Sequence, residues 1–386
     1  MWTSCLSNKL FWVVLLTLTF LQSPVGRAQT MNTSAAPAAS DDASAAQQST
    51  STTKEDAPGA SGRDKAAKSA VDDGKPAGDA APAVPKEDWN TLAIPPGMKI
   101  ADPLFRPARS DYPKYTREFV QLQYRNVDIV DLYVLKPKGV EKPPVMLYLY
   151  SFPSDTDRFQ ADDFDELVTK NGFAAVGFVS ALTGPRYHDR PGKQWFISEL
   201  QESLGESVHD VQFILNYLAK RGDLDMSRVG MFGGGSGASI AIMAAAADPR
   251  IKVLDLIGPW GDWPDWLARS PLVPNDERAA YLRPEFLKKV ENLDPVKWLP
   301  MLTNQKVRLQ YLKDDEITTR LVRERILKAA PANAQVVVYD SEVAYVSVMG
   351  SAGEKLFDWP KEQLGAVGEQ KTAVKDATAG SAQSRE

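Results

Sequence analysis

The chain has 386 residues, a net charge of −5 and 43% hydrophobic residues, a length that allows one large domain or two small ones. No basic stripe indicates a nucleic-acid partner, and the mild acidity mainly favours solubility. With one cysteine and two widely separated histidines, the sequence predicts no zinc centre, and we expect no metal and no cofactor.

The first 28 residues have the pattern of a secretory signal peptide. Lys9 precedes an uncharged apolar run, Leu10 to Leu21, and Gly26-Arg27-Ala28 has the small-x-small pattern of a cleavage site. The run is shorter than the roughly 20 residues that span a bilayer, so we favour cleavage after Ala28 over an uncleaved anchor. We therefore expect export to the periplasm or the extracellular space.

Residues 29 to 86 are rich in Ala, Ser, Asp, Pro and Gly and have almost no large apolar side chains. Such a segment cannot bury enough surface to offset the entropy of ordering it. We expect a disordered tether here, which serves as a spacer or holds the domain near the cell envelope. Residues 369 to 386 are predicted to form a second disordered tail, and residues 87 to 368 the folded domain.

The first half of this domain predicts a hairpin followed by alternating strands and helices. Polar and apolar residues alternate in two stretches around Arg125-Asn126, as in an antiparallel pair of half-buried strands. The continuous apolar runs that follow are typical of central parallel strands. The predicted elements are strands 118–124, 128–135, 145–150 and 173–179, and a helix over 161–171.

The second half continues the alternation and contains one insertion. Apolar residues recur at three- and four-residue steps over 197–218, which predicts a long amphipathic helix. Tryptophans and short helical segments in 258–305 predict a cap inserted after the fourth parallel strand. The remaining predictions are strands 229–232, 251–257, 307–312 and 335–339, and helices 318–330 and 354–364.

One glycine-rich turn in this domain carries the main chemical signal. Gly234-Gly235-Ser236-Gly237-Ala238 has the small-x-Ser-x-small spacing of a nucleophile elbow, a sharp strand-to-helix turn. Such a turn strains the backbone of its central serine and holds the hydroxyl above the edge of the sheet, beside the amides of a helix N-terminus. The alternative is that small residues here only allow the strand and the helix to pack closely.

The turn and the order of the elements resemble the α/β-hydrolase superfamily, in particular serine esterases and dienelactone-hydrolase-like and prolyl-oligopeptidase-like members. The resemblance implies a mostly parallel sheet covered by helices on both faces, an N-terminal antiparallel hairpin and a helical cap. It also implies Ser236 as the nucleophile and, within Asp314-Asp315-Glu316-Ile317, Asp314 as the acid, with Asp315 next in line. The alternative for both carboxylates is to complement the dipole of the next helix.

The base that this chemistry needs is not where the resemblance places it. No histidine follows Ser236, and Ala344 or a neighbour stands at the expected place after the last strand. The carboxylates of Asp340 and Glu342 are weak bases unless buried. His188 follows a parallel strand at the same sheet edge as Ser236, so it is a candidate displaced base or substrate ligand, or a loop residue without a role.

Two other features complete the expected site. The amides of Phe152 and Gly237 are candidates for an oxyanion hole, although Pro153 has no amide to give. Tyr150, Tyr187, Trp195, Trp260 and Trp263, with Trp266 nearby, are candidates for an aromatic wall around an acyl or peptidyl substrate. The alternative is that these tryptophans attach the cap to the core.

Three functions fit these residues. The first is a serine esterase or peptidase with His188 as the base, and the second is a pseudo-hydrolase that acts as a binding or scaffolding module. The third is a dinucleotide-binding oxidoreductase, because Gly233-x-Gly235-x-x-Ala238 with Asp255 further on matches that fingerprint. The third is disfavoured, because Asp255 falls inside an apolar strand instead of at its end.

The leader sequence gives a direct test. When the full chain is expressed in an exporting host, we expect the exported protein to begin at Gln29, as read by N-terminal sequencing or intact mass. Exchanging Val13 and Leu16 for charged residues breaks the apolar run and is expected to leave the precursor uncleaved inside the cell. Export of that variant in normal amounts would contradict the signal-peptide interpretation.

Overall fold

The computed structural model describes residues 88, 90–96, 98, 103, 105–123, 129–150, 159, 162–182, 200–341, 343–345 and 354–366. By internal contacts the chain divides into Met1–Ala83 and Val84–Glu386, and all described residues belong to the second unit. His188, Phe152, Tyr187 and Trp195 lie outside the described residues. No helix in the described ranges is both long enough and apolar enough to cross a membrane.

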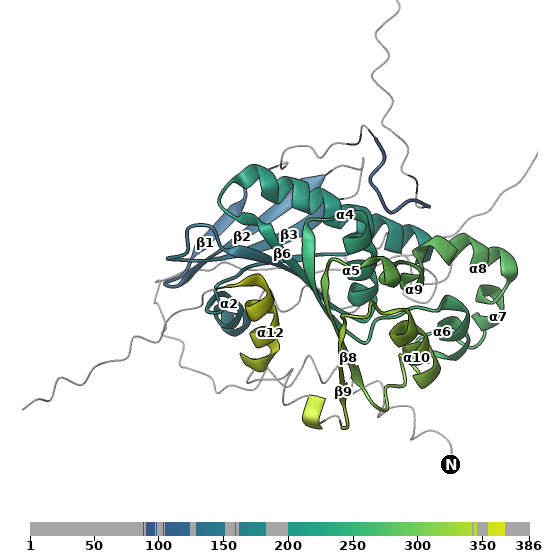
Figure 1. The fold of residues 1–386 in the computed structure, drawn as a ribbon. Coiled ribbons are helices and arrows are strands. Elements are labelled where there is room, and N and C mark those ends of the chain that lie inside the picture. Colours follow the sequence, from purple (N-terminus) through teal and green to yellow (C-terminus); the bar gives the residue numbers. More distant parts are fainter. Residues whose placement is uncertain are drawn as a thin grey trace, which may run out of the picture. The chain divides into compact units, whose positions relative to one another are not determined.

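A nine-stranded sheet forms the centre of the second unit, in the order β1-β2-β3-β5-β4-β6-β7-β8-β9 (Figure 1). The strands β1, β2 and β3 are antiparallel, and β3 also lies antiparallel to β5. All later pairs are parallel. The strands are β1 (Ala108–Asp111), β2 (Tyr115–Gln123), β3 (Ile129–Pro137), β4 (Pro144–Leu149), β5 (Ala174–Phe178), β6 (Asp225–Gly234), β7 (Ile251–Ile257), β8 (Lys306–Leu312) and β9 (Gln335–Tyr339).

This sheet confirms the expected mostly parallel α/β architecture and the N-terminal hairpin. The strands predicted at 118–124 and 128–135 pair in register as β2 and β3, with Leu122 opposite Val130. The strand β1 has no counterpart among the predicted elements. All four of its residues, ARSD, are exposed, so the strand lacks the alternation of buried and exposed positions from which strands are recognised.

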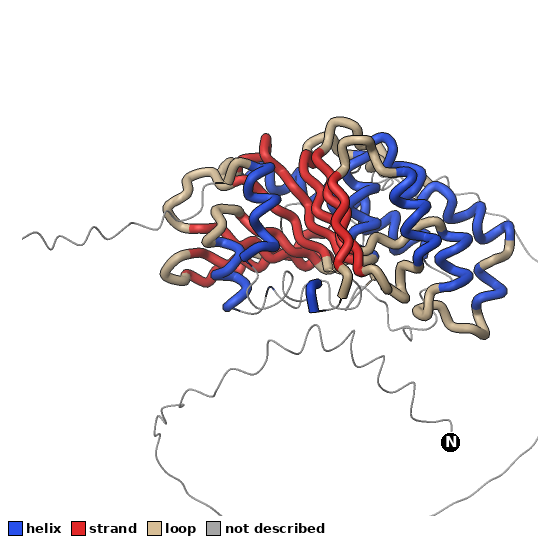
Figure 2. Tube along the Cα trace, turned by 60° about the horizontal axis from the view of Figure 1, so that its bottom comes forward, coloured by secondary structure: helices blue, strands red, loops and turns tan. Residues whose placement is uncertain are grey.

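Helices cover both faces of the sheet, as Figures 1 and 2 show. One face carries α4 and α5, and helices of the insertion pack against these two. The other face carries α2 and α12. The helices outside the insertion include α2 (Asp162–Thr169), α4 (Leu200–Arg221), α5 (Ser236–Ala247), α10 (Arg320–Ala329) and α12 (Glu354–Leu364). The insertion contains α6 (Trp263–Arg269), α7 (Arg278–Tyr281), α8 (Pro284–Val290), η3 (Glu291–Leu293), α9 (Pro295–Trp298) and η4 (Leu299–Met301).

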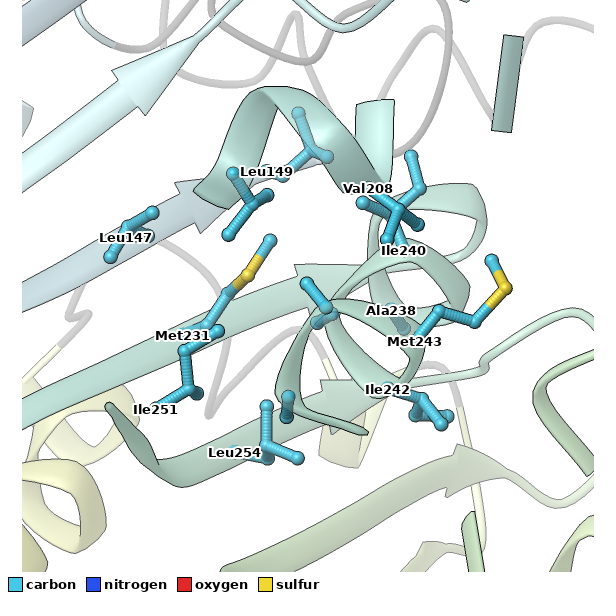
Figure 3. Packing of buried hydrophobic residues seen from close by; sticks show 14 of the residues in the cluster. Leu147, Leu149, Val208, Met231, Ala238, Ile240, Ile242, Met243, Ile251 and Leu254 are labelled. Carbon is cyan, nitrogen blue, oxygen red and sulfur yellow. The ribbon is translucent and has the colours of Figure 1, made fainter. Parts of the chain in front are cut away.

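The helix α5 is the inner helix of the fold. Its residues Ser236 to Ala245 are all buried, because the sheet lies on one side while α4 and the inserted α9 and η4 contact it elsewhere. Figure 3 shows Ile240 and Met243 of this helix among core side chains that include Val208 of α4 and Leu254 of β7. A helix that is apolar on all sides is expected in such a place.

A buried ion pair lies on the face of the sheet beneath α12. The carboxylate of Asp255 on β7 is fully buried and accepts hydrogen bonds from Arg308 at 2.8 and 2.6 Å and from the Gln310 amide at 2.7 Å. The ring of Trp359 in α12 lies 4.8 Å from the guanidinium carbon of Arg308. Because the carboxylate is enclosed and bonded to three donors, it offers no acceptor to a ribose, and the dinucleotide interpretation loses its acidic residue.

The ion pair predicts an asymmetric mutational response. Asp255→Ala leaves the Arg308 guanidinium buried without its partner, and we expect a loss of about 3–5 kcal/mol in unfolding free energy, measured by urea denaturation. The double variant Asp255→Leu with Arg308→Met removes both charges and is expected to lose far less. Glu324→Ala, which breaks the exposed pair with Arg320, is the matched control at under about 1 kcal/mol. A single variant no worse than this control would contradict the interpretation.

Candidate active site

The strand-to-helix turn between β6 and α5 is present, and Gly235 is its turning residue. The strand β6 ends at Gly234 and α5 begins at Ser236, so Gly235 alone connects them. Its dihedral angles are φ 50° and ψ −116°, a region that residues with a side chain rarely adopt. The amide of Gly235 donates to the carbonyl of Ile257 at 2.9 Å, which fixes the turn beside the end of β7.

Two glycines flank Gly235 at equal spacing, and both are needed for packing. A Cβ atom on Gly233 would lie 2.6 Å from the backbone of Ala238, and one on Gly237 would overlap the carbonyl oxygen of Leu149 at the end of β4. These are the close approaches of strand to helix and of helix to neighbouring strand that a tight elbow demands. The small-x-centre-x-small pattern is therefore Gly233-x-Gly235-x-Gly237.

This geometry corrects the expectation for Ser236. The strained dihedral angles that we expected at the serine lie at Gly235, one residue earlier. Ser236 is the first residue of α5, has no positive φ and is 1% exposed, whereas Gly235 is half-buried. The five small residues in a row allow either Gly235 or Ser236 to be the centre of the turn. The sequence prediction placed the centre at Ser236 because serine is a possible nucleophile. The signal that could have found Gly235 is that both flanking positions are then glycine.

The acidic loop after β8 lies at the same edge of the sheet. Asp314 is exposed, whereas Asp315 is partly buried and its Oδ1 accepts the amides of Ile317 at 2.8 Å and Thr318 at 3.2 Å. Burial raises the pKa of the Asp315 carboxyl, and the two amides oppose that rise. The hydroxyl of Thr318 donates to the carbonyl of Gly258, the residue after β7. Of the two carboxylates, Asp315 is the one held against the body of the sheet.

The described residues place no histidine at this edge. His209 is fully buried in α4, and its Nε2 lies 2.7 Å from the carbonyl oxygen of Thr91, so its role is structural. Of the carboxylates considered as bases, Asp340 has a side chain that is 89% exposed and pairs with Lys313 at 3.7 Å. Ala344 lies in a short helical segment after β9, and Glu342 lies outside the described residues.

The described aromatic residues of the expected wall are packed against other parts of the fold. Tyr150 is half-buried and packs against Phe232 with ring centroids 5.3 Å apart. Trp260 and Trp263 are 2% and 1% exposed, and the indole of Trp263 donates to the carbonyl of Leu293 at 3.0 Å. These two tryptophans correct the expectation, because they pack the insertion into the core and do not face solvent.

Hydrogen bonds fix the insertion internally and attach it to α5. Asp294 accepts the amides of Asp262, Trp263 and Val296 at 2.9 to 3.0 Å, which joins the starts of α6 and α9. The Ser239 hydroxyl in α5 donates to the carbonyl of Trp260 at 2.7 Å. The insertion is thus fixed at its first turn instead of resting loosely on the sheet edge. Across the described part of the chain, no cluster of three acidic, histidine or cysteine side chains is arranged to hold a metal ion.

The geometry predicts which of two neighbouring positions faces outward from the elbow. Cys5 is the only cysteine in the sequence, so a protein produced from Gln29 onward contains none. A cysteine placed by Gly235→Cys is expected to react with iodoacetamide at least roughly tenfold faster than one placed by Ser236→Cys, because the second side chain is enclosed. Circular dichroism checks that both variants are folded. Faster labelling at position 236 would restore the serine as the centre of the turn.

No protein-family model and no curated protein sequence matches the chain. Solved structures do match. Acetyl xylan esterase 1 from Thermoanaerobacterium sp. JW/SL YS485 is similar with a TM-score of 0.51 at 15% identity, over 68% of this chain and 88% of that one. The acetyl xylan esterase from Paenibacillus sp. R4 is similar with a TM-score of 0.50 at 15% identity, over 62% of this chain and 84% of that one.

An acylaminoacyl peptidase from Pyrococcus horikoshii gives a TM-score of 0.51 at 14% identity, over 69% of this chain and 46% of the peptidase. At these identities the likeness concerns the fold. It agrees with the strand order, the glycine elbow after the third parallel strand and the insertion after the fourth. The chain therefore has the α/β-hydrolase fold, as its sequence predicted.

Proposed function

We propose that this chain is a non-catalytic member of the α/β-hydrolase fold that binds a ligand at the elbow edge without cleaving it. The observation that carries the proposal is Gly235 at the centre of the turn. An acyl-transfer enzyme of this fold needs a hydroxyl or thiol at that point, and glycine has no side chain. Ser236 belongs to the helix and is enclosed.

The lack of a histidine at the position of the base independently supports a non-catalytic function. No histidine follows Ser236 in the sequence, and His209 is committed to Thr91 inside the fold. Loss of the nucleophile and loss of the base each cost such enzymes orders of magnitude in rate. A chain that departs from the pattern at both positions keeps the architecture of the family without its proton-transfer chemistry.

What remains at the edge is suited to binding. The helix α5 presents the amides of its first turn there, with no acidic residue in that turn, and amides at a helix N-terminus attract carbonyl and carboxylate oxygens. The glycine at the turn permits a ligand to approach the backbone closely. Since the structural neighbours are named as acetyl xylan esterases and an acylaminoacyl peptidase, acetylated xylo-oligosaccharides and N-acyl peptides are the first ligands to test.

The leader pattern completes the proposal. An exported binding module on a long polar segment would sample ligands outside the cytoplasm, either free or close to the cell envelope. The support for this part is the sequence of residues 1 to 86 alone.

The test compares labelling and turnover of the exported protein with those of three variants. We expect no labelling by a fluorophosphonate probe and no hydrolysis of short acyl esters, and no change in Ser236→Ala or His188→Ala. In contrast, acetylated xylo-oligosaccharides or N-acyl peptides are expected to raise the melting temperature in a concentration-dependent way. Gly235→Leu fills the turn and is expected to abolish that rise; a melting temperature of this variant close to that of the parent shows that it is folded.

The competing function gives a distinct result. If Ser236 and His188 form a displaced catalytic pair, the parent is labelled and hydrolyses esters, and both Ser236→Ala and His188→Ala lose that activity together. That outcome would replace the binding module with an enzyme. Labelling that survives both substitutions would point to a contaminating hydrolase, which a second purification step removes.

A further inference from the structure

The strand β9 ends the sheet, and its outer edge is open. It pairs in parallel with β8 on one side, and no strand in the described part of the chain pairs with its other side (Figure 1). A row of free backbone amides and carbonyls on such an edge is a template for pairing with another strand.

The hydrogen bonds to β8 show which residues of β9 face outward. The amide of Lys313 donates to the carbonyl of Tyr339 at 2.9 Å, so Tyr339 directs its backbone groups toward β8. Because alternate residues of a strand direct their amide and carbonyl to opposite neighbours, Gln335 and Val337 also face β8. Val336 and Val338 direct theirs to the open edge.

The side chains leave this edge unprotected. Val336 and Val338 are each 46% exposed, and the five-residue strand QVVVY contains no charge and no proline. The strand at the other end of the sheet differs, since β1 carries the exposed and charged Arg109 and Asp111. Charged residues on an edge oppose pairing with another chain. The β1 edge is therefore protected against such pairing, and the β9 edge is not.

We propose that β9 pairs antiparallel with β9 of a second copy of this chain, across a two-fold axis at Val337, so that two sheets form one. In this register Val336 of each copy lies opposite Val338 of the other. The outward amides and carbonyls of these two residues then form about four hydrogen bonds. The valine pairs also bury apolar side chains that are exposed in the single chain.

The charges around β9 fit the same register. Lys306 begins β8 and Lys328 lies in the last turn of α10, both near the end at which β9 begins. Four carboxylates lie at the other end, where Asp340 follows β9 and Asp314, Asp315 and Glu316 follow β8. They outnumber the two cations there, which are Lys313, paired with Asp340 at 3.7 Å, and Arg323, which donates to the carbonyls of Leu312 and Lys313. Antiparallel pairing about a two-fold axis brings the basic end of each copy to the acidic end of the other. A parallel arrangement would bring like charges together.

The register is tested by a crosslink at the axis. In the proposed pair, Val337 of one copy lies opposite Val337 of the other in a non-hydrogen-bonded pair, with a Cα separation of about 4.5 Å, within the range for a disulfide. The exported chain has no other cysteine once the leader is removed. Val337→Cys is expected to form a disulfide dimer on mild oxidation, whereas Val343→Cys, at a 79% exposed position beyond the strand, is expected to remain monomeric.

The association itself is tested by sedimentation velocity of the exported protein over a range of concentrations. We expect a dimer that weakens at high salt. Val338→Pro removes an outward amide without removing a bond to β8, and Val338→Lys places a charge on the edge; each is expected to raise the dimer dissociation constant at least tenfold. Val343→Lys is the matched control and is expected to leave it unchanged.

Any of three results would overturn the proposal. One is a parent protein that stays monomeric at 100 µM, which would leave the edge to a strand of a different protein or to none. The other is a dimer that both Val338 variants retain at full strength while circular dichroism shows them folded. A crosslink through Val343→Cys with none through Val337→Cys would likewise place the contact elsewhere.

Discussion

The fold depends on how closely α5 approaches the sheet at its first turn. Gly233 and Gly237 bring the backbone of the helix against β6 and against the carbonyl of Leu149 on β4, and side chains at either position would overlap backbone atoms. Because backbone atoms cannot move aside as side chains do, this contact sets the position of α5. The helix in turn packs against α4 on one side and the insertion on the other. The two glycines therefore also determine the position of the insertion.

The same constraint determines what the turn can do chemically. A turn this tight requires one residue with positive φ, and here glycine meets that need at no steric cost. In an enzyme of this fold the strain at that point positions a nucleophile. The chain thus has the geometry of the elbow with the reactive group absent from its centre. The binding proposal rests on this turn and on the amides of the first turn of α5 beside it.

Much of the fold could be predicted from sequence because its signals are local. The apolar runs of β4, β5 and β7 and the three- and four-residue steps of α4 depend only on which faces are buried. The strand β1 could not be predicted in this way, because both of its faces are exposed and only pairing with β2 makes it a strand. The site was harder still. Five consecutive small residues from Gly233 to Gly237 allow two centres for the turn. The flanking glycines favour Gly235, and its dihedral angles identify it. The roles of Trp260 and Trp263 could not be predicted either, because the spacing of the tryptophans does not show whether a side chain faces a cavity or the core.

The position of α12 has a consequence for biosynthesis. This helix supplies Trp359, whose ring lies over the Arg308 guanidinium. Its last residue, Leu364, and the following Gly365 supply carbonyls that accept hydrogen bonds from Arg228 near the start of β6. The helix is also the last described element of the chain. A nascent polypeptide therefore cannot enclose the charge between β7 and β8 until α12 has been synthesised. Until then a central pair of strands stays open on one face, so this domain reaches its native state only after α12 has emerged.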